Sequence, residues 1–342
     1  MTSAGPFDPA RGAPGISRRD IEGLGLTAAR EPVRILALTG GVSSDIYQVE
    51  AGGRVFVVKR ALARLRVADD WQAPVERNRH EADWLETVAR IRPGAVPAVL
   101  ARDDEAGLFA MEYFDPAQFP VWKELLRTGE VDLCTAEAVG RSLAAIHAAT
   151  AHDRTIAERF ATGAIFHAIR LEPYFEASAR RHPDAAGRLL DLSARTLNTE
   201  IALVHGDVSP KNILTGPRGP VFLDAECAWF GDPAFDLAFC LNHLLLKSLW
   251  IRAAARRLLD AFAALDAAYR SGITWEPPAA LERRTAELLG ALLLARVDGK
   301  SPVEYLGPAG RALVRKIALD LIAAPPESPR EVARIWAERT GA

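Results

Sequence analysis

The feature that most constrains the fold is a change in hydrophobic pattern near residue 116. From residue 33 to 113, short runs rich in Val, Ile and aromatic residues alternate with glycine turns, a pattern typical of β-strands. After residue 116, long stretches rich in Ala, Leu and Arg place their apolar residues at helical spacing. The sequence therefore predicts three parts, listed as a flexible tail and lead-in (1–30), an N-terminal lobe (31–115) and a C-terminal helical lobe (116–342).

The two patterned parts predict particular elements. For the N-terminal lobe, strands are predicted at 33–38, 46–50, 55–59, 98–101 and 108–113, and one long helix at 74–90. For the C-terminal lobe, helices are predicted at 135–149, 164–181, 185–197, 234–267, 279–297 and 309–323. One β-rich segment, 201–226, interrupts these helices. The predicted class is α+β, with an antiparallel five-strand sheet followed by a mainly helical lobe.

Composition excludes several classes of protein. The 42 basic and 44 acidic residues give a net charge of −2, so no basic excess is available for a nucleic-acid backbone. Three scattered cysteines fit reduced thiols better than a disulfide framework or a zinc site. No run of about 18 apolar residues is present, and the N-terminus lacks a signal-peptide pattern. We expect a soluble cytoplasmic protein with no nucleic-acid or membrane partner.

The β-rich segment carries the residues with the clearest chemistry. His205-Gly206-Asp207 is followed five residues later by Asn212, and a strand ends at Asp224. This is the spacing of a kinase-type catalytic loop, in which the aspartate accepts or orients the acceptor's hydroxyl proton and the amide oxygen binds Mg²⁺. Asp224 would add the anionic oxygen that Mg²⁺ prefers.

A simpler interpretation of the same residues is a turn in which Asp and Asn bond to the local backbone. His205 is expected to pack behind the loop rather than to act as a base, because Asp207 has the exposed position. The wider pattern of the chain favours the catalytic interpretation.

That wider pattern lies in the N-terminal lobe. The turn containing Gly40, Gly41, Ser43 and Ser44 joins two strands and could cover phosphates with its N–H groups, although an ordinary hairpin is an equal alternative. Lys59 ends a strand and fits the lysine that contacts the α- and β-phosphates. Glu81, in the following helix, is placed to hold that lysine.

In these motifs the sequence resembles the aminoglycoside phosphotransferase superfamily, small-molecule kinases with a bilobal protein-kinase-like fold that include choline and methylthioribose kinases. The resemblance covers residues 38–306 and is strongest at 205–246, where Gly231-Asp232-Pro233-Ala234-Phe235-Asp236 resembles a family signature. It implies that Asp207 is catalytic and that Asn212 and Asp224 bind Mg²⁺. It also implies a buried structural role for Asp236.

The resemblance also implies an adenine-contacting hinge at residues 111–114, which includes Met111, Glu112 and Tyr113. The sequence departs from protein kinases at Ser209, where those enzymes have a lysine, and at Asp224-Ala225-Glu226. Too few residues separate Asp224 from the next helix to form an activation loop, so a protein substrate is not expected. Glu226 is interpreted either as a contact to a second Mg²⁺ or to a water bound to it, or as a solvated glutamate at the end of a strand.

We therefore predict a kinase that uses ATP and Mg²⁺ to phosphorylate a hydroxyl of a small molecule such as an aminoglycoside, amino-alcohol or sugar-like metabolite, as a monomer or homodimer. The alternatives are a pseudokinase that binds nucleotide or a partner, and a metal-dependent hydrolase, which would leave Lys59 and Glu81 unexplained. The sequence does not identify the acceptor. Candidate acceptor-site residues are Trp229, Phe230, His243, Arg296, Asp298 and Tyr305, of which Trp229 and Phe230 are better explained as core and Asp298 as a helix-end residue.

Overall fold

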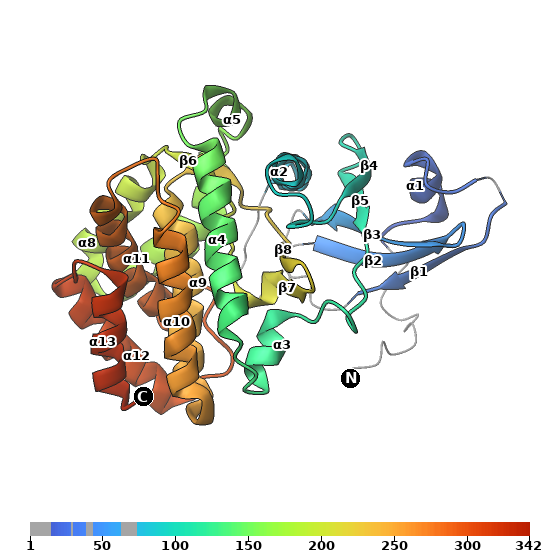
Figure 1. The fold of residues 1–342 in the computed structure, drawn as a ribbon. Helices are drawn as coiled ribbons and strands as arrows, with labels where there is room; N and C mark the ends of the chain where they lie inside the picture. The colour runs from blue at the N-terminus through green and yellow to red at the C-terminus, as the bar shows by residue number, and fades with distance from the viewer. Residues whose placement is uncertain (1–14, 29, 39–43, 63–73) are drawn as a thin grey trace.

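The N-terminal lobe is a twisted antiparallel sheet of five strands (Figure 1). The computed structural model describes residues 15–28, 30–38, 44–62 and 74–342. The strand order is β1-β2-β3-β5-β4, with every neighbouring pair antiparallel. The strands are β1 (Val33–Ala37), β2 (Ser44–Ala51), β3 (Arg54–Ala61), β4 (Val99–Asp103) and β5 (Leu108–Glu112). The five strands and the α+β class predicted from the sequence are confirmed.

Successive side chains of β3 point to opposite faces of this sheet. Phe56 and Val58 pack with Ile21 in a small core beneath α1 (Arg18–Gly23). Val57 points to the opposite face and joins the main core, which contains Val88 of α2 (Arg77–Ile91). Residues two apart on a strand share a face, so Lys59 is directed toward α2 and the C-terminal lobe.

The described part of the predicted tail is well packed. Ser17 caps α1, and its side chain and that of Asp20 satisfy each other's backbone N–H groups in a capping box. Ile16, Ile21 and Leu26 are buried against the sheet. The capping box and these apolar residues anchor 15–26 to the first lobe.

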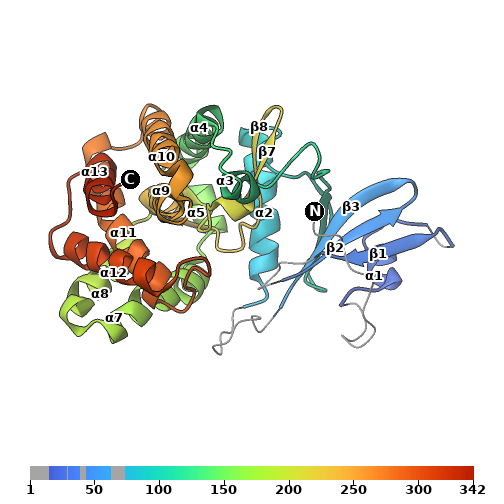
Figure 2. The same cartoon turned by 90° about the horizontal axis from the view of Figure 1, so that it is seen from below.

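The C-terminal lobe is a bundle of helices (Figure 2). Its α-helices are α3 (Trp122–Arg127), α4 (Leu133–Thr150), α5 (Arg154–Arg159), α6 (Gly163–Phe166), α7 (Ala177–Arg181), α8 (Pro183–Leu197), α9 (Pro233–Trp250), α10 (Ala255–Arg270), α11 (Pro278–Asp298), α12 (Pro308–Ala323) and α13 (Pro329–Thr340). A π-helix, η2 (His167–Glu176), joins α6 to α7, and short 3₁₀ turns occur at η3 (Pro210–Asn212) and η4 (Arg252–Ala254). The mainly helical second lobe predicted from the sequence is confirmed.

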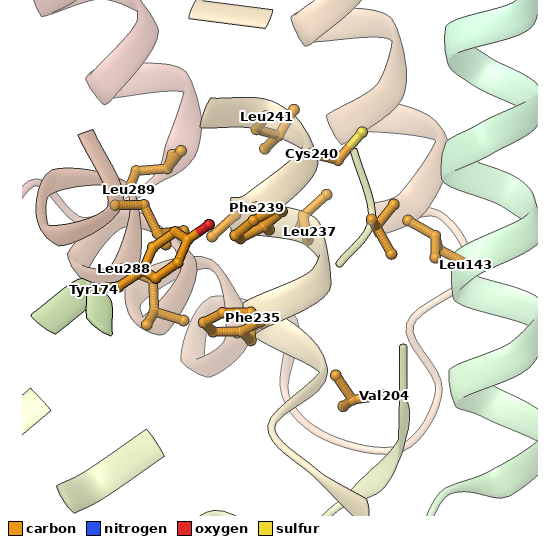
Figure 3. Close-up of a cluster of buried hydrophobic side chains, with 14 of the residues drawn as sticks. Leu143, Tyr174, Val204, Phe235, Leu237, Phe239, Cys240, Leu241, Leu288 and Leu289 are labelled. Carbon is orange, nitrogen blue, oxygen red and sulfur yellow. The ribbon is translucent and has the colours of Figure 1, made fainter. Parts of the chain in front are cut away.

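The centre of this bundle is α9, in which residues 233–248 are all buried. Figure 3 shows Phe235 and Phe239 of α9 packed beside Leu288. A helix that is buried along almost its whole length must be covered on all sides, and α4, α10 and α11 pack around it. Helices α4 and α10 approach so closely that a Cβ at Gly140 would lie 2.4 Å from the carbonyl oxygen of Leu265. Glycine is therefore required at this crossing.

Two short two-stranded antiparallel sheets carry the β-rich segment into the space between the lobes. Strand β6 (Ala202–Val204) pairs with β9 (Trp229–Gly231), and β7 (Ile213–Gly216) pairs with β8 (Gly219–Phe222). Residues 205–212 therefore connect two different sheets, and residues 223–228 return from the second sheet to the first. These two connections lie together because both of their ends are fixed by strand pairing.

Two predicted helices are broken in the structure. The helix predicted at 234–267 ends at Trp250 and continues as α10 after a bend of 117°. The helix predicted at 164–181 widens to a π-helix around Pro173, which has no N–H to donate and so interrupts the α-helical ladder. Within the described ranges, no single helix is long and apolar enough to cross a membrane.

Candidate active site

The loop between β6 and β7 is held from beneath by Asp236 of α9. Its carboxylate accepts hydrogen bonds from the backbone N–H of His205 at 2.7 Å and of Gly206 at 2.8 Å. Gly206 has a φ of +78°, and a Cβ there would lie 2.7 Å from the Cβ of Cys227. The glycine of the His-Gly-Asp motif is therefore required both by the backbone conformation and by packing.

His205 is buried behind this loop. Its Nε2 lies 3.0 Å from the carbonyl oxygen of Leu223, and its Nδ1 accepts from the N–H of Asp207 at 3.1 Å. Burial lowers the pKa of His205, which favours the neutral ring with its proton on Nε2. Both ring nitrogens are occupied, so the imidazole positions the loop and is not free to act as a base.

Asp207 faces two cations through one carboxylate oxygen. Its Oδ2 lies 2.8 Å from a guanidinium nitrogen of Arg170 and 3.2 Å from Nζ of Lys211. Arg170 also donates to the carbonyl oxygen of Gly206 at 2.7 Å, which fixes the guanidinium against the loop. Among the described residues, no hydrogen bond or ion pair engages Oδ1 of Asp207. The side chain is buried rather than exposed as the sequence analysis expected, and its role as the catalytic aspartate stays a prediction.

Asn212 and Asp224 lie at facing ends of the two connections. The amide nitrogen of Asn212 donates to the carbonyl oxygen of Asp207 at 3.0 Å, which orients its amide oxygen away from that bond. The carbonyl oxygen of Asn212 accepts from the N–H of Leu223 at 2.9 Å, next to Asp224. Asp224 has a φ of +67°, a region that non-glycine residues seldom adopt and that is often found at functional sites.

Lys59 links the two lobes at this point. Its ammonium group lies 2.6 Å from a carboxylate oxygen of Glu81 and also contacts the carboxylate of Asp224. Burial alone would lower the pKa of Lys59, but Asp224 and Glu81 together raise it above its ordinary value. Burial likewise opposes ionisation of Asp224, yet Lys59 and Lys211 hold its pKa well below the ordinary value. The site therefore contains a fixed ammonium beside an ionised carboxylate.

Glu226 is buried and paired with an arginine, so the interpretation of Glu226 as a solvated glutamate is wrong. The buried guanidinium of Arg77 lies 3.0 Å from its carboxylate, so a positive charge already balances it. Over the described ranges, no three His, Cys, Asp or Glu side chains converge to hold a metal ion. A Mg²⁺ site here would combine the Asp224 carboxylate and the Asn212 amide oxygen with phosphate oxygens, a donor set that suits this ion. A role for Glu226 as a further ligand stays a prediction.

The structure places the remaining predicted nucleotide contacts only in part. Gly40, Gly41 and Ser43 lie outside the described residues. Ser44 begins β2 and is buried. Met111, Glu112 and Tyr113 lie at the end of β5, where Val57 of β3 pairs with Met111, and their role as a hinge stays a prediction.

Several residues of the site carried no local signal in the sequence. Arg170, from η2, and Arg77, from α2, lie far along the chain from the carboxylates they bind. His147 lies 3.3 Å from Asp236 and 2.7 Å from the hydroxyl of Tyr269, so the support of the loop extends into α4 and α10. Only the tertiary fold brings these groups together.

Replacing Asp236 with alanine should destabilise the protein, because two buried N–H groups of the loop would lose their acceptor. An unsatisfied buried donor costs about 1–3 kcal/mol, so a loss of roughly 2–6 kcal/mol is expected in urea unfolding. The matched control is Asp191→Ala at an exposed position on α8, which should change stability by less than about 0.5 kcal/mol. Equal stabilities of the two variants would contradict the support assigned to Asp236.

Three of the candidate acceptor-site residues have structural roles. Trp229 is buried and stacks on Phe166 with ring centroids 4.3 Å apart. Phe230 is buried in the main core. Asp298 forms hydrogen bonds of 2.6 Å with Arg315 at the end of α11. The other three candidates lie around the second half of α9: His243, Arg296 and Tyr305.

A five-stranded lobe whose lysine–glutamate pair faces a His-Gly-Asp loop defines the class of kinase-like phosphotransferases. The chain belongs to the phosphotransferase enzyme family, whose model matches residues 34–275.

Comparison with individual proteins agrees with this membership. The chain is 26% identical over 255 residues to methylthioribose kinase 2 of Oryza sativa subsp. japonica, covering 64% of this chain and 59% of that protein. It is 28% identical over 226 residues to a methylthioribose kinase of Pectobacterium atrosepticum, covering 58% and 56%. The chain thus spans less than two thirds of the length of these curated relatives.

Solved structures share the fold at low sequence identity. Choline kinase from Streptococcus pneumoniae has a TM-score of 0.51 at 15% identity, covering 90% of this chain and 97% of that one. Amicoumacin kinase, solved with AMP-PNP and Ca²⁺, has a TM-score of 0.56 at 14% identity, covering 93% and 96%. The bilobal protein-kinase-like fold expected from the sequence is therefore confirmed.

Proposed function

We propose that this protein is a small-molecule kinase that transfers the γ-phosphoryl group of ATP to a hydroxyl, with Mg²⁺ as cofactor. The observation that carries the proposal is the contact of Lys59 with both Glu81 and Asp224, which joins the sheet to the catalytic loop. A nucleotide between the lobes would meet an ammonium from one side and carboxylate and amide oxygens from the other. Family membership supports the reaction class.

In the proposed mechanism the residues of the site position the phosphates, the metal and the acceptor hydroxyl. Lys59, held by Glu81, would contact the α- and β-phosphates, and Asn212 and Asp224 would hold the metal. Bound Mg²⁺ would neutralise phosphate charge. Asp207 orients the acceptor hydroxyl through Oδ1, while Arg170 and Lys211 keep its other oxygen fixed.

In the transfer step one bond forms, one bond breaks and one proton moves. The acceptor oxygen forms a bond to the γ-phosphorus as the bond from that phosphorus to the β–γ bridging oxygen breaks, and ADP leaves. The hydroxyl proton passes to the Asp207 carboxylate. Positioning and charge neutralisation supply most of the catalysis in such reactions.

A small acceptor is proposed because the chain runs from Asp224 into β9 and then into α9 at Pro233, leaving no activation segment to bind a peptide. The curated relatives are named as kinases of methylthioribose, and a solved neighbour is named as a choline kinase, which supports an acceptor of this size. We also propose a cytoplasmic monomer or homodimer that binds neither nucleic acid nor membranes.

The test is ADP release from Mg-ATP in the presence of a panel of hydroxylated metabolites, together with calorimetric titration of Mg-ATP. We expect Mg-ATP to bind and at least one hydroxylated compound to accelerate ADP release. Binding without turnover over a broad panel would favour the pseudokinase alternative, and turnover without ATP would favour a hydrolase.

A further inference from the structure

Lys247 on α9 is a buried cation that has no carboxylate partner among the described residues. Its residue is 2% exposed, and among the described residues no ion pair or hydrogen bond involves its ammonium group. The ammonium instead lies 5.3 Å from the ring centre of Trp250 and 5.2 Å from that of Tyr305. These two rings stack with their centroids 4.5 Å apart.

A second cation lies beside it, and no carboxylate in the described part of the chain forms an ion pair with this cation. Arg296 of α11 bonds to the hydroxyl of Tyr174 at 3.1 Å and to Ser301, but its Nε is buried without an acceptor. Burial lowers the pKa of Lys247 most, and the charge of Lys123 lowers it next. Glu304 and Glu124 raise this pKa and the charge of Arg296 lowers it, and together these effects bring it to about 8. Lys247 is therefore still mainly charged at neutral pH.

The carboxylates near this pair are already engaged. Glu304 binds Lys123 at 3.0 Å, and Glu124, on α3, binds Arg127 at 2.7 Å. Burial, followed by Arg296 and Lys247, holds the pKa of His243 well below its ordinary value, so its imidazole is neutral. The region therefore carries an uncompensated positive charge.

This arrangement is costly in the free protein. A buried ammonium without a counter-ion loses hydration, and cation–π contacts return only about 0.5–2 kcal/mol. A bound anion would supply the missing partner. The aromatic pair already holds an ammonium group, so it has no room for the ammonium of a cationic ligand.

Direct contacts connect this region to the catalytic loop. Arg170, which binds Asp207, lies 5.6 Å from the ring centre of Phe239 and 5.8 Å from that of Tyr174. Figure 3 shows Tyr174 beside Phe239. The centroids of these two rings lie 5.9 Å apart. Tyr174 contacts both arginines, since Arg296 is also 5.8 Å from its ring centre.

The spacing along α9 sets the scale of a ligand. Phe239, His243 and Lys247 follow one another at intervals of four and so share a face of the helix. At 1.5 Å per residue, Lys247 lies about 12 Å along the axis from Phe239. A ligand with one end at Lys247 and the other near Asp207 must therefore be several bonds long.

We propose that Lys247 and Arg296 form a subsite for an anionic group of the acceptor, a carboxylate or a phosphate, whose hydroxyl lies at Asp207. The inference rests on the proposed function and narrows its acceptor to hydroxylated anions. It also separates this protein from kinases whose acceptors are cationic.

The test uses six-carbon polyols that differ in charge at one end: gluconate (carboxylate), sorbitol 6-phosphate (phosphate), sorbitol (neutral) and glucamine (cation). Each is titrated by calorimetry into the full-length protein saturated with Mg-ADP. At least one anion should bind, while sorbitol and glucamine should bind at least tenfold more weakly. Comparison of gluconate with sorbitol 6-phosphate identifies which anionic group is preferred.

The decisive variant is Lys247→Met, which keeps the length of the side chain and removes its charge. We expect anion affinity to fall roughly tenfold or more, as is usual for a lost hydrogen bond to a charged group. Lys247→Arg should retain part of the affinity. The control Lys316→Met, at an exposed position on α12, should bind as the wild type does.

Thermal unfolding without ligand separates a binding role from a structural one. Because the unpaired charge is removed, the melting temperature of Lys247→Met should equal or exceed that of the wild type. Preferential binding of glucamine, no binding by either anion, or unchanged anion affinity in Lys247→Met would each overturn the subsite. Mg-ATP titration of the same samples tests the proposed function independently of these results.

Discussion

Replacement of Asp207 with asparagine should lower kcat by about 10²–10⁴-fold, the usual contribution of a catalytic acid or base. Asparagine keeps the shape of the side chain and can still lie against Arg170 and Lys211, but it cannot accept the hydroxyl proton. Mg-ATP affinity should change little, because Lys59, Asn212 and Asp224 are untouched. Initial rates with an identified acceptor, together with calorimetry, measure both quantities.

Asp191→Asn is the matched control, since it makes the same chemical change at an exposed position far from the loop. It should leave kcat unchanged. A wild-type kcat in Asp207→Asn would remove Asp207 from the reaction. A loss of activity accompanied by loss of the folded state would instead show that Arg170 needs the charge of Asp207 for stability.

Replacement of Lys59 with methionine should lower kcat/KM by about 10²-fold or more, the scale seen when one pre-positioned charge is lost. Methionine fills the space of the lysine stem, so the sheet should stay intact. Glu81 and Asp224 would lose the ammonium that now lies between them.

The same variant makes a prediction about pH. Burial, opposed by Lys59, raises the pKa of Glu81 from 4.5 to about 7, and removal of Lys59 should raise it further. The folded variant then holds a proton that the unfolded chain releases, so stability should fall as the pH rises from about 4.5 through at least 7. Lys59→Met combined with Glu81→Gln should show a smaller fall, and equal slopes would contradict the pairing of these residues.

The sequence predicted the N-terminal lobe well because its signals are local. Each strand there alternates or is rich in β-branched residues, and glycine turns separate the strands, so pattern alone locates them. The His205–Asn212 spacing was equally local, and the structure brings Asp207, Asn212 and Asp224 together with Lys59 and Glu81.

The support of the site could not be predicted because it depends on contacts distant in sequence. Arg170 reaches Asp207 from a π-helix that the sequence presented as part of a regular helix. Arg77 forms an ion pair with Glu226, which lies 149 residues further along the chain. The charge of Lys247 is unusual only because α9 is buried at the centre of the bundle.

The most direct test of the account is calorimetric titration of Mg-ATP into the wild type, Asp207→Asn and Asp224→Asn, with initial rates measured over a range of Mg²⁺ concentrations. Asp224→Asn removes the anionic oxygen from the proposed metal site, so it should weaken Mg-ATP binding and turnover together, with partial recovery at high Mg²⁺. Asp207→Asn should bind Mg-ATP as the wild type does and lose turnover at every Mg²⁺ concentration. Abolished nucleotide binding in Asp207→Asn with unchanged binding in Asp224→Asn would contradict the roles assigned to these two aspartates.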